Sequence, residues 1–297
     1  MKRTGFSFFL AAYVLFFKAV LFAGEPAVFY ETDFDLLALG ATQYDPGHPE
    51  QDGWFLAGAA DFGYGEIQDE FANPGRALHE HADRNAGSWG QTIDKRFLAP
   101  PDLSIYPQVT LEVDFYATTS NLEGRNSYIA ALEVFGGPHP GYYMIGFSVT
   151  SGNGDVKGEA GLRVNLSCFN GSDNNESVPL TIGYNLAWET WHHVRIVIDQ
   201  SADSYVSLTV NEQTQTLDGY VLPRSNDEGI WKRGQLMESI QTLIVPVDDF
   251  GESSDDDIYW DNLALHGQCT LQADLTGDCK VNMEDLAILA AEWLMGV

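Results

Sequence analysis

Val109-Thr110-Leu111-Glu112-Val113-Asp114-Phe115-Tyr116 alternates apolar and polar side chains without a break. Successive side chains of a strand point to opposite faces, so this pattern predicts a β-strand with one buried and one polar face. The same alternation recurs at Tyr128–Phe135, Tyr142–Thr150, Leu162–Ser167, His192–Asp199, Tyr205–Asn211, Ile240–Val247 and Ile258–His266. No helical repeat is comparably strong. We therefore predict an all-β fold in which two antiparallel sheets pack face to face as a jelly-roll sandwich.

The segment 36–106 carries a weaker signal. Its Gly, Asp and Pro residues, as in Asp45-Pro46-Gly47 and Asn73-Pro74-Gly75, favour turns. We expect long loops around a few strands here, one of them near Ser88–Phe97.

Length and composition exclude several classes of protein. The chain has 297 residues, of which 44% are hydrophobic, enough to bury a sizeable core and too many for a disordered or fibrous chain. The formal net charge of −28 would repel nucleic-acid phosphates and anionic lipid head groups. We expect no nucleic-acid partner.

The first residues have the pattern of a targeting segment. Lys2 and Arg3 precede an apolar run from Phe6 to Phe17, which Lys18 interrupts before it continues to Gly24. The pattern predicts a secretory signal peptide over residues 1–24 and a secreted, extracellular or cell-surface protein without a membrane span in the mature form. A membrane anchor is the alternative, but a span needs about 20 uninterrupted apolar residues.

The three cysteines fit an oxidising compartment. Cys269 and Cys279 are close enough in sequence to form a disulfide. Cys168 would then remain as a buried thiol at a strand end.

The stretch Trp191-His192-His193-Val194, with the following hairpin to Asn211, resembles the corresponding strand of laminin-G-like domains in the concanavalin A-like jelly-roll superfamily. The resemblance implies a sandwich over residues 25–267. Lectins, carbohydrate-binding modules, glycanases and polysaccharide lyases share this fold, so the fold alone does not choose a function.

The C-terminal segment has the spacing of a calcium loop. Loop positions 1, 3, 5, 9 and 12 bear side-chain oxygens, and position 7 can offer a backbone carbonyl, which suits a cation that needs six to eight oxygens. An apolar stripe of one helix follows at Leu286, Leu289, Ala290 and Trp293. The alternative is an acidic loop that caps the helix without a metal. The loop residues concerned are Asp274, Thr276, Asp278, Lys280, Asn282 and Asp285.

This segment, residues 268–297, resembles one repeat of a type I dockerin, an EF-hand-type module. The resemblance implies Ca²⁺ as the cofactor, the loop residues above as its ligands, and attachment to a cohesin-like or cell-surface partner. Position 6 is Cys279 where Gly is usual, position 3 is Thr276 where Asn or Asp is usual, and dockerins carry two such repeats. A Cys269–Cys279 disulfide could enforce the turn, and the apolar stripe would pack on the sandwich or on a partner.

A second cation site is expected where the sandwich begins and ends. Glu31 and Asp33 open the first predicted strand, and Asp261 lies in the last. Jelly-roll carbohydrate-binding modules that this arrangement resembles pair these strands and hold a structural calcium between them. A solvated acidic surface is the alternative.

A polar face is the expected carbohydrate site. Alternation places His193 and Arg195 opposite the core on their strand, and Arg163 with Asn165 opposite the core on another. If these strands share a sheet, their side chains and nearby aromatic rings would hold a sugar. The aromatic candidates are Trp54, Trp89, Tyr142, Tyr143 and Trp231, each of which could instead anchor the core.

The sequence offers little catalytic equipment. No strand carries two Glu flanking an Asp, as retaining glycanases of this superfamily do. A lyase would need a Tyr or His base beside a group that neutralises a uronate, and Tyr142, His193, Arg195 and Arg163 could supply both. His79 and His81 could form a metal pair on one strand face, but no third ligand is evident, and we expect them to be solvated.

Together these patterns predict a secreted, non-catalytic carbohydrate-binding sandwich for an extracellular polysaccharide, with a calcium-dependent C-terminal attachment motif. The first alternative is a secreted polysaccharide-degrading enzyme, glycanase or lyase, on the same fold. The second is a structural or adhesive cell-surface protein.

Overall fold

The structure is a computed structural model, which describes most of the chain. The residues before Pro26, which include the predicted signal peptide, and several segments between strands lie outside the described part. In the described part, no helix is long and apolar enough to cross a membrane. The described ranges are 26–42, 52–56, 63–82, 91–97, 106–119, 128–136, 143–151, 161–169, 175–200, 202–223, 237–244, 256–268 and 283–294.

The larger layer is a nine-stranded antiparallel sheet. Its order is β15-β14-β13-β7-β17-β5-β4-β2, and β1 pairs with β17 beside this path. The strands are β1 (Ala27–Thr32), β2 (Gly40–Ala41), β4 (Gly63–Gln68), β5 (Ala77–Ala82), β7 (Gln108–Thr119), β13 (His192–Asp199), β14 (Ser204–Val210), β15 (Gln213–Thr216) and β17 (Asp256–Gln268).

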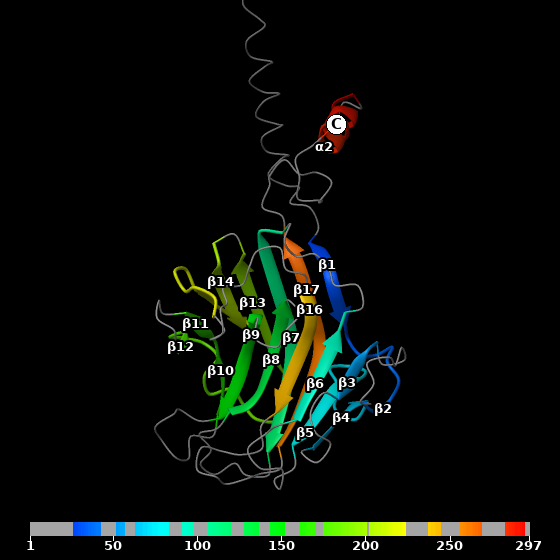
Figure 1. Cartoon of the computed structure of the whole chain (residues 1–297), viewed down its shortest axis with the longest axis vertical. Helices are drawn as coiled ribbons and strands as arrows, with labels where there is room; N and C mark the ends of the chain where they lie inside the picture. The colour runs from blue at the N-terminus through cyan, green and yellow to red at the C-terminus, as the bar shows by residue number, and fades with distance from the viewer. Residues whose placement is uncertain are drawn as a thin grey trace, which may run out of the picture.

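The second layer is a six-stranded sheet of order β10-β9-β8-β16-β6-β3. Figure 1 looks through both layers, so that the strands of the two sheets overlap. A small pair, β11 (Ser167–Phe169) with β12 (Asn175–Ser177), lies beside them, and α2 (Met283–Leu294) is the C-terminal helix. The strands of the second sheet are β3 (Trp54–Leu56), β6 (Gln91–Arg96), β8 (Tyr128–Gly136), β9 (Tyr143–Ser151), β10 (Leu162–Asn165) and β16 (Met237–Ile244).

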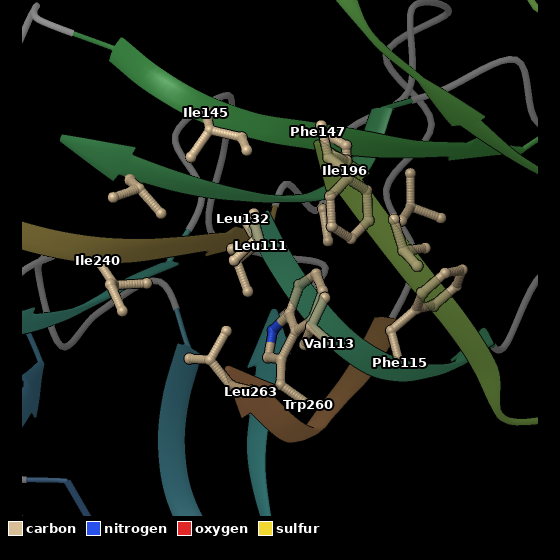
Figure 2. Packing of buried hydrophobic residues seen from close by; sticks show 14 of the residues in the cluster. Leu111, Val113, Phe115, Leu132, Ile145, Phe147, Ile196, Ile240, Trp260 and Leu263 are labelled. Carbon is tan, nitrogen blue, oxygen red and sulfur yellow. The ribbon is translucent and has the colours of Figure 1, made fainter. Parts of the chain in front are cut away.

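The core fills the space between the two sheets. Phe115 and Trp260 of the large sheet pack against Phe147 of the small one, with ring centroids 6.1 to 6.3 Å apart. Figure 2 shows side chains from both layers converging on this space. Burial of these apolar faces removes them from water and drives the pairing of the sheets.

The predicted all-β fold of two antiparallel sheets is confirmed. Each segment with period-two alternation forms strands over its described residues apart from single positions between or beside them, and Ser88–Phe97 contains β6. The first and last strands of the sandwich pair as expected, with Glu31 opposite Ala264. The segment 36–106 holds more strands than its turn residues suggested, because β4 and β5 form a hairpin there with polar side chains on both faces.

The sandwich therefore presents two outer faces to solvent. On the large sheet, the outward side chains come from β4, β5, β17, β7 and β13, which are consecutive neighbours. On the small sheet they come from β3, β6, β16, β8, β9 and β10. The core lies between the outward side chains of the two sheets, so residues on opposite sheets cannot belong to one site.

Candidate functional site

The residues predicted to share one polar face lie on both sides of the molecule. Arg163 and Asn165 belong to β10 of the six-stranded sheet, whereas His193 and Arg195 belong to β13 of the nine-stranded sheet. All four alternate with core residues, so the two pairs point away from each other across the sandwich. The prediction of one shared face, and of a lyase site combining His193 and Arg195 with Arg163, is wrong because their strands belong to different layers.

The predicted platform Trp54 is also wrong as a sugar-binding ring. Its side chain is 0% exposed within the core, and its Nε1–H donates to the hydroxyl of Tyr30 at 2.9 Å. The other predicted platforms, Trp89, Tyr142 and Trp231, lie outside the described residues, as does the side chain of Tyr143. They stay predictions.

His193 and Arg195 are tied into a network on the outer face of the large sheet. His193 Nδ1 lies 2.7 Å from Asp114 Oδ1, and Arg195 Nε lies 2.9 Å from Glu112 Oε1. The hydrogen bond to Asp114 raises the pKa of His193, against the opposing effect of burial. A cavity of about 120 Å³ lies beside this pair, lined by Pro26, Thr110, Glu112, Arg195, His266 and Gln268.

The outer face of the six-stranded sheet carries a row of residues in register across five strands. Gln241 of β16 lies opposite Asp94 of β6 on one side and opposite Glu133 of β8 on the other. Phe55 of β3 continues the row beside Asp94, and Gly146 of β9 continues it beside Glu133. We call these five residues the carboxyl row. Their neighbours along each described strand point into the core, so the row points outward.

Although the carboxyl row points away from the core, two of its residues are screened from solvent, whereas Gln241 and Glu133 are half-buried. Phe55 is 5% exposed and Asp94 is 8% exposed. Gln241 Nε2–H donates to Asp94 Oδ1 at 2.7 Å, which fixes that carboxyl in place. Gly146, which lies opposite Glu133, adds no side chain to the row.

Glu133 is an acid of this row with a raised pKa. Burial raises the pKa of its carboxyl to about 7, because the charged form is poorly solvated there. None of the described residues forms a hydrogen bond or ion pair with it. A carboxyl in this state is protonated below neutral pH and can donate a proton to a bound ligand.

The register also sets the distance between the two acids of the row. Asp94 and Glu133 stand on either side of Gln241, hence two strand spacings apart, which is roughly 9 to 10 Å between their Cα atoms. Pairs of carboxyls that invert a glycosidic centre stand about 6.5–9.5 Å apart, wide enough for a water between them. The register thus places the two acids on one sheet face with a single residue between them, an arrangement that no single strand of the sequence offered.

Two of the predicted sugar-binding residues lie further along the same face. Asn165 Nδ2–H donates to Thr150 Oγ1 at 2.9 Å. Arg163 donates to the hydroxyl of Tyr184 at 3.0 Å, and its guanidinium lies 4.4 Å from the centre of that ring. Both side chains are therefore held in place on the small sheet, on the side where the carboxyl row lies.

Among the described residues, no three His, Cys, Asp or Glu side chains are grouped so that they could hold a metal ion. Glu31 and Asp33 are exposed, whereas Asp261 is buried and accepts hydrogen bonds from the backbone N–H groups of Asn73 and Asn262 at 2.8 and 2.7 Å. Burial raises the pKa of Asp261 to about 7, with the charges of nearby aspartates adding to the effect.

The C-terminal calcium loop is described only at its end. Asp274, Thr276, Asp278, Lys280 and Asn282 lie outside the described residues, together with Cys269 and Cys279. Asp285, at loop position 12, is buried in the first turn of α2, and the predicted helix is confirmed. Leu286 and Leu289 of its apolar stripe are exposed. Cys168 is a buried free thiol in β11, as predicted.

Comparison with known proteins supports the fold. No family model matches the chain, and no curated relative matches it. A solved structure of the alginate lyase Aly36B, a double mutant in complex with alginate trisaccharide, matches with a TM-score of 0.50 and 17% identity over 81% of this chain and 98% of that chain.

Two further solved structures resemble the chain less closely. The carbohydrate esterase vb_24B_21 from the Shiga toxin-encoding bacteriophage phi24B has a TM-score of 0.48 and 14% identity over 77% of this chain and 100% of that chain. The endo-β-1,4-glucuronan lyase from the fungus Trichoderma reesei has a TM-score of 0.44 and 11% identity over 84% and 98%. The match to the Aly36B structure, at 17% identity, shows a shared sandwich fold.

Proposed function

We propose that the protein is a polysaccharide-cleaving enzyme whose active site is the carboxyl row of the six-stranded sheet. The observation that carries this proposal is the pair of acids, Asp94 and Glu133, which the register places on one sheet face with their Cα atoms roughly 9 to 10 Å apart. Glu133 would act as the proton donor and Asp94 as the base. Enzymes that work with two acids need environments that keep one protonated and the other ionised.

The bond changes follow from these roles. The protonated Glu133 gives its proton to the glycosidic oxygen as the bond from that oxygen to the anomeric carbon breaks. Asp94 takes a proton from a water whose oxygen forms the new bond to the anomeric carbon from the opposite side. Gln241, through its hydrogen bond to Oδ1, keeps Asp94 oriented during the step. Water adds across the bond, and both acids regain their starting states by proton exchange with solvent.

Charge favours a neutral polysaccharide as substrate. Asp94 lies next to the central residue of the row, and the whole chain carries a formal charge of −28. A chain of uronates would have to bring further carboxylates next to these acids, which like-charge repulsion opposes. The row also lacks, among its own five residues, a cation that could neutralise a uronate.

The structural neighbours support a polysaccharide ligand. The match with a TM-score of 0.50 is to a sandwich that was solved with an alginate trisaccharide. We take from it only the class of ligand. We therefore favour the enzymatic alternative over non-catalytic binding, the first expectation from the sequence. Glu133 and Asp94 offer chemistry that no sequence motif indicated.

A panel of neutral and acidic polysaccharides tests the proposal. We expect new reducing ends without the ultraviolet absorbance of unsaturated sugars, and a strong preference for neutral chains. Unsaturated products would overturn the hydrolytic mechanism in favour of elimination. Retention of a polysaccharide without any product would overturn catalysis and restore the binding module.

For the C-terminal segment we propose calcium-dependent attachment of a secreted protein to a cohesin-like or cell-surface partner. Asp285, at loop position 12, is buried at the start of α2, as expected of a carboxylate that binds the calcium ion. Calcium titration of the whole chain should raise the helix signal in circular dichroism, and Asp285→Ala should weaken that response. An unchanged signal in millimolar calcium would contradict the proposal.

A further inference from the structure

The outer face of the nine-stranded sheet bears two exposed aromatic rings. Tyr64 of β4 is 44% exposed, and Phe71, just after β4, is 47% exposed. Large aromatic side chains are usually buried, so two half-exposed rings on one sheet face suggest a role at the surface. Neither ring belongs to the carboxyl row, which lies on the other side of the core.

Tyr64 is held in place by a charged scaffold. Its ring stacks on His81 with centroids 4.9 Å apart and an angle of 27°. His81 Nδ1 and His79 Nε2 each lie 2.8 Å from the same oxygen, Oδ1 of Asp257. His79 also reaches Glu66 through Nδ1 at 3.2 Å. One face of the Tyr64 ring is thus supported by imidazole, while much of its area stays open to solvent.

Asp257 is the centre of this scaffold. Burial would raise the pKa of its carboxyl, but the hydrogen bonds from His79 and His81 outweigh burial and lower it to about 2. The carboxylate therefore stays charged and keeps both imidazoles in position. The sequence-based expectation that this His pair is solvated is wrong, because His79 is buried between Glu66 and Asp257.

Phe71 is supported in a different way. Its ring lies 6.0 Å from Tyr116 at an angle of 30° and 5.4 Å from Tyr259. Tyr259 in turn stacks on His79 with centroids 4.3 Å apart and an angle of 9°. His79 also meets the Tyr64 ring edge-on at 5.4 Å, so a continuous set of rings in contact connects the two exposed ones. We call Tyr64, Phe71 and the rings that support them the aromatic face.

We propose that the aromatic face is a second, non-catalytic binding surface for a polysaccharide chain, with Tyr64 and Phe71 as stacking platforms. The inference takes its ligand from the proposed function, because an enzyme that cleaves a polymer gains from a second contact with the same chain. Rings already fixed by their neighbours lose little conformational freedom when a sugar stacks on them.

The chemistry of the face suits a sugar better than a protein. Between the two exposed rings lie Tyr259 and the imidazole of His79 with its carboxylate partner Asp257, so apolar contact alternates with hydrogen-bonding groups. A pyranose has this same division, with a C–H face that stacks and hydroxyls at its edge. The core of a protein interface is instead a continuous apolar patch depleted of charge.

The test uses the whole chain carrying Glu133→Gln, so that a polysaccharide is bound without being cut. Retardation in a native gel that contains soluble polysaccharide measures binding. We expect Tyr64→Ala and Phe71→Ala each to weaken binding about tenfold. Tyr64→Phe keeps the ring and should retain binding. Leu39→Ala removes a side chain that is 50% exposed and serves as the matched control.

A second measurement separates this proposal from the catalytic one. In the chain with Glu133 intact, kcat/KM for short soluble oligosaccharides should stay unchanged in Tyr64→Ala, while release of sugar from long or insoluble polysaccharide falls. If the protein cuts nothing, the gel assay still reports on the aromatic face. Unchanged retardation of both ring variants with thermal unfolding intact, equal loss in Leu39→Ala, or a change in self-association instead of sugar binding would each overturn the proposal.

Discussion

The two outer faces of the sandwich differ in how their acidic side chains are paired. On the nine-stranded sheet, three described carboxylates have cationic or imidazole partners: Asp257 is bonded by two histidines, Asp114 by His193, and Glu112 by Arg195. Asp261 of that sheet, whose pKa is raised to about 7, accepts two backbone hydrogen bonds instead. On the six-stranded sheet, Glu133 is half-buried without a partner among the described residues, and burial raises its pKa to about 7. A carboxylate whose charge is balanced is stable and unreactive, whereas a poorly solvated one keeps its proton near neutral pH.

The two outer faces also differ in how exposed their aromatic rings are. Phe55 in the carboxyl row is almost completely buried, whereas Tyr64 and Phe71 on the other face are half exposed. A screened acid suits chemistry on a bond, and an exposed supported ring suits binding of a chain. The comparison therefore assigns cleavage to one sheet and chain binding to the other, and each assignment can be broken separately.

The largest effect is expected from Glu133→Gln. Loss of the proton donor should lower kcat about 10² to 10⁴-fold, since a general acid contributes that much to the rate. Glu112→Gln on the other sheet is the matched control and should keep activity. Reducing-end assays on a neutral polysaccharide provide the measurement, and equal activity in both variants would remove the distinction between the faces.

Asp94→Asn should have the next largest effect, on the order of a hundredfold in kcat, because the amide cannot take a proton from water. The stereochemistry of the first product is a sharper test of the same residue. Proton NMR of a freshly started reaction should show an inverted anomeric centre, because the proposed base activates a water instead of forming a covalent intermediate. A retained centre would contradict the role of Asp94 as base.

The pH dependence of kcat/KM should report on Glu133 with a smaller change. Its carboxyl has a pKa of about 7, and only the protonated form can donate. We expect kcat/KM to fall about tenfold per pH unit once the pH rises above that value. The residual rate of Glu133→Gln should lack this alkaline limb. A limb that persists in the variant would assign the titration to another group.

Much of the fold could be predicted because alternation is a local signal. Leu111, Val113 and Phe115 alternate with polar residues, and β7 forms where that pattern lies. The hairpin of β4 and β5 was missed because its inward positions include Gly65 and Glu80, which break the apolar period. A buried acid on an inward face removes the very signal by which a strand is recognised.

The site was predicted less well, because alternation fixes which face of a strand is polar but not which sheet the strand joins. His193 and Arg163 were both correctly expected to point away from the core, yet they lie on opposite sides of it. Asp94 and Glu133 are distant in sequence, and only the pairing of β6, β16 and β8 brings them into one row. No spacing along the chain could reveal that pair.

Burial raises the pKa of both Glu80 and Glu133, but only Glu133 faces outward. Glu80 points into the core, where its Oε1 accepts a hydrogen bond from Trp260 at 3.1 Å and its Oε2 has no partner. Burial raises its pKa to about 8 from an ordinary value of 4.5. The folded state thus holds this proton longer than the unfolded state, and the stability is greatest below pH 4.5 and falls as the pH rises toward 8.

Glu80→Gln should therefore make the folded protein less sensitive to pH without changing kcat. The neutral amide removes a penalty that grows by roughly 3 kcal/mol between pH 5 and 8. Urea unfolding at several pH values provides the measurement. Some slope should remain, because Glu133 and Asp261 also have raised pKa values in this range. A variant that loses activity while its pH–stability profile is unchanged would instead assign Glu80 to catalysis. It would contradict the view that the buried acid of the core acts only on stability.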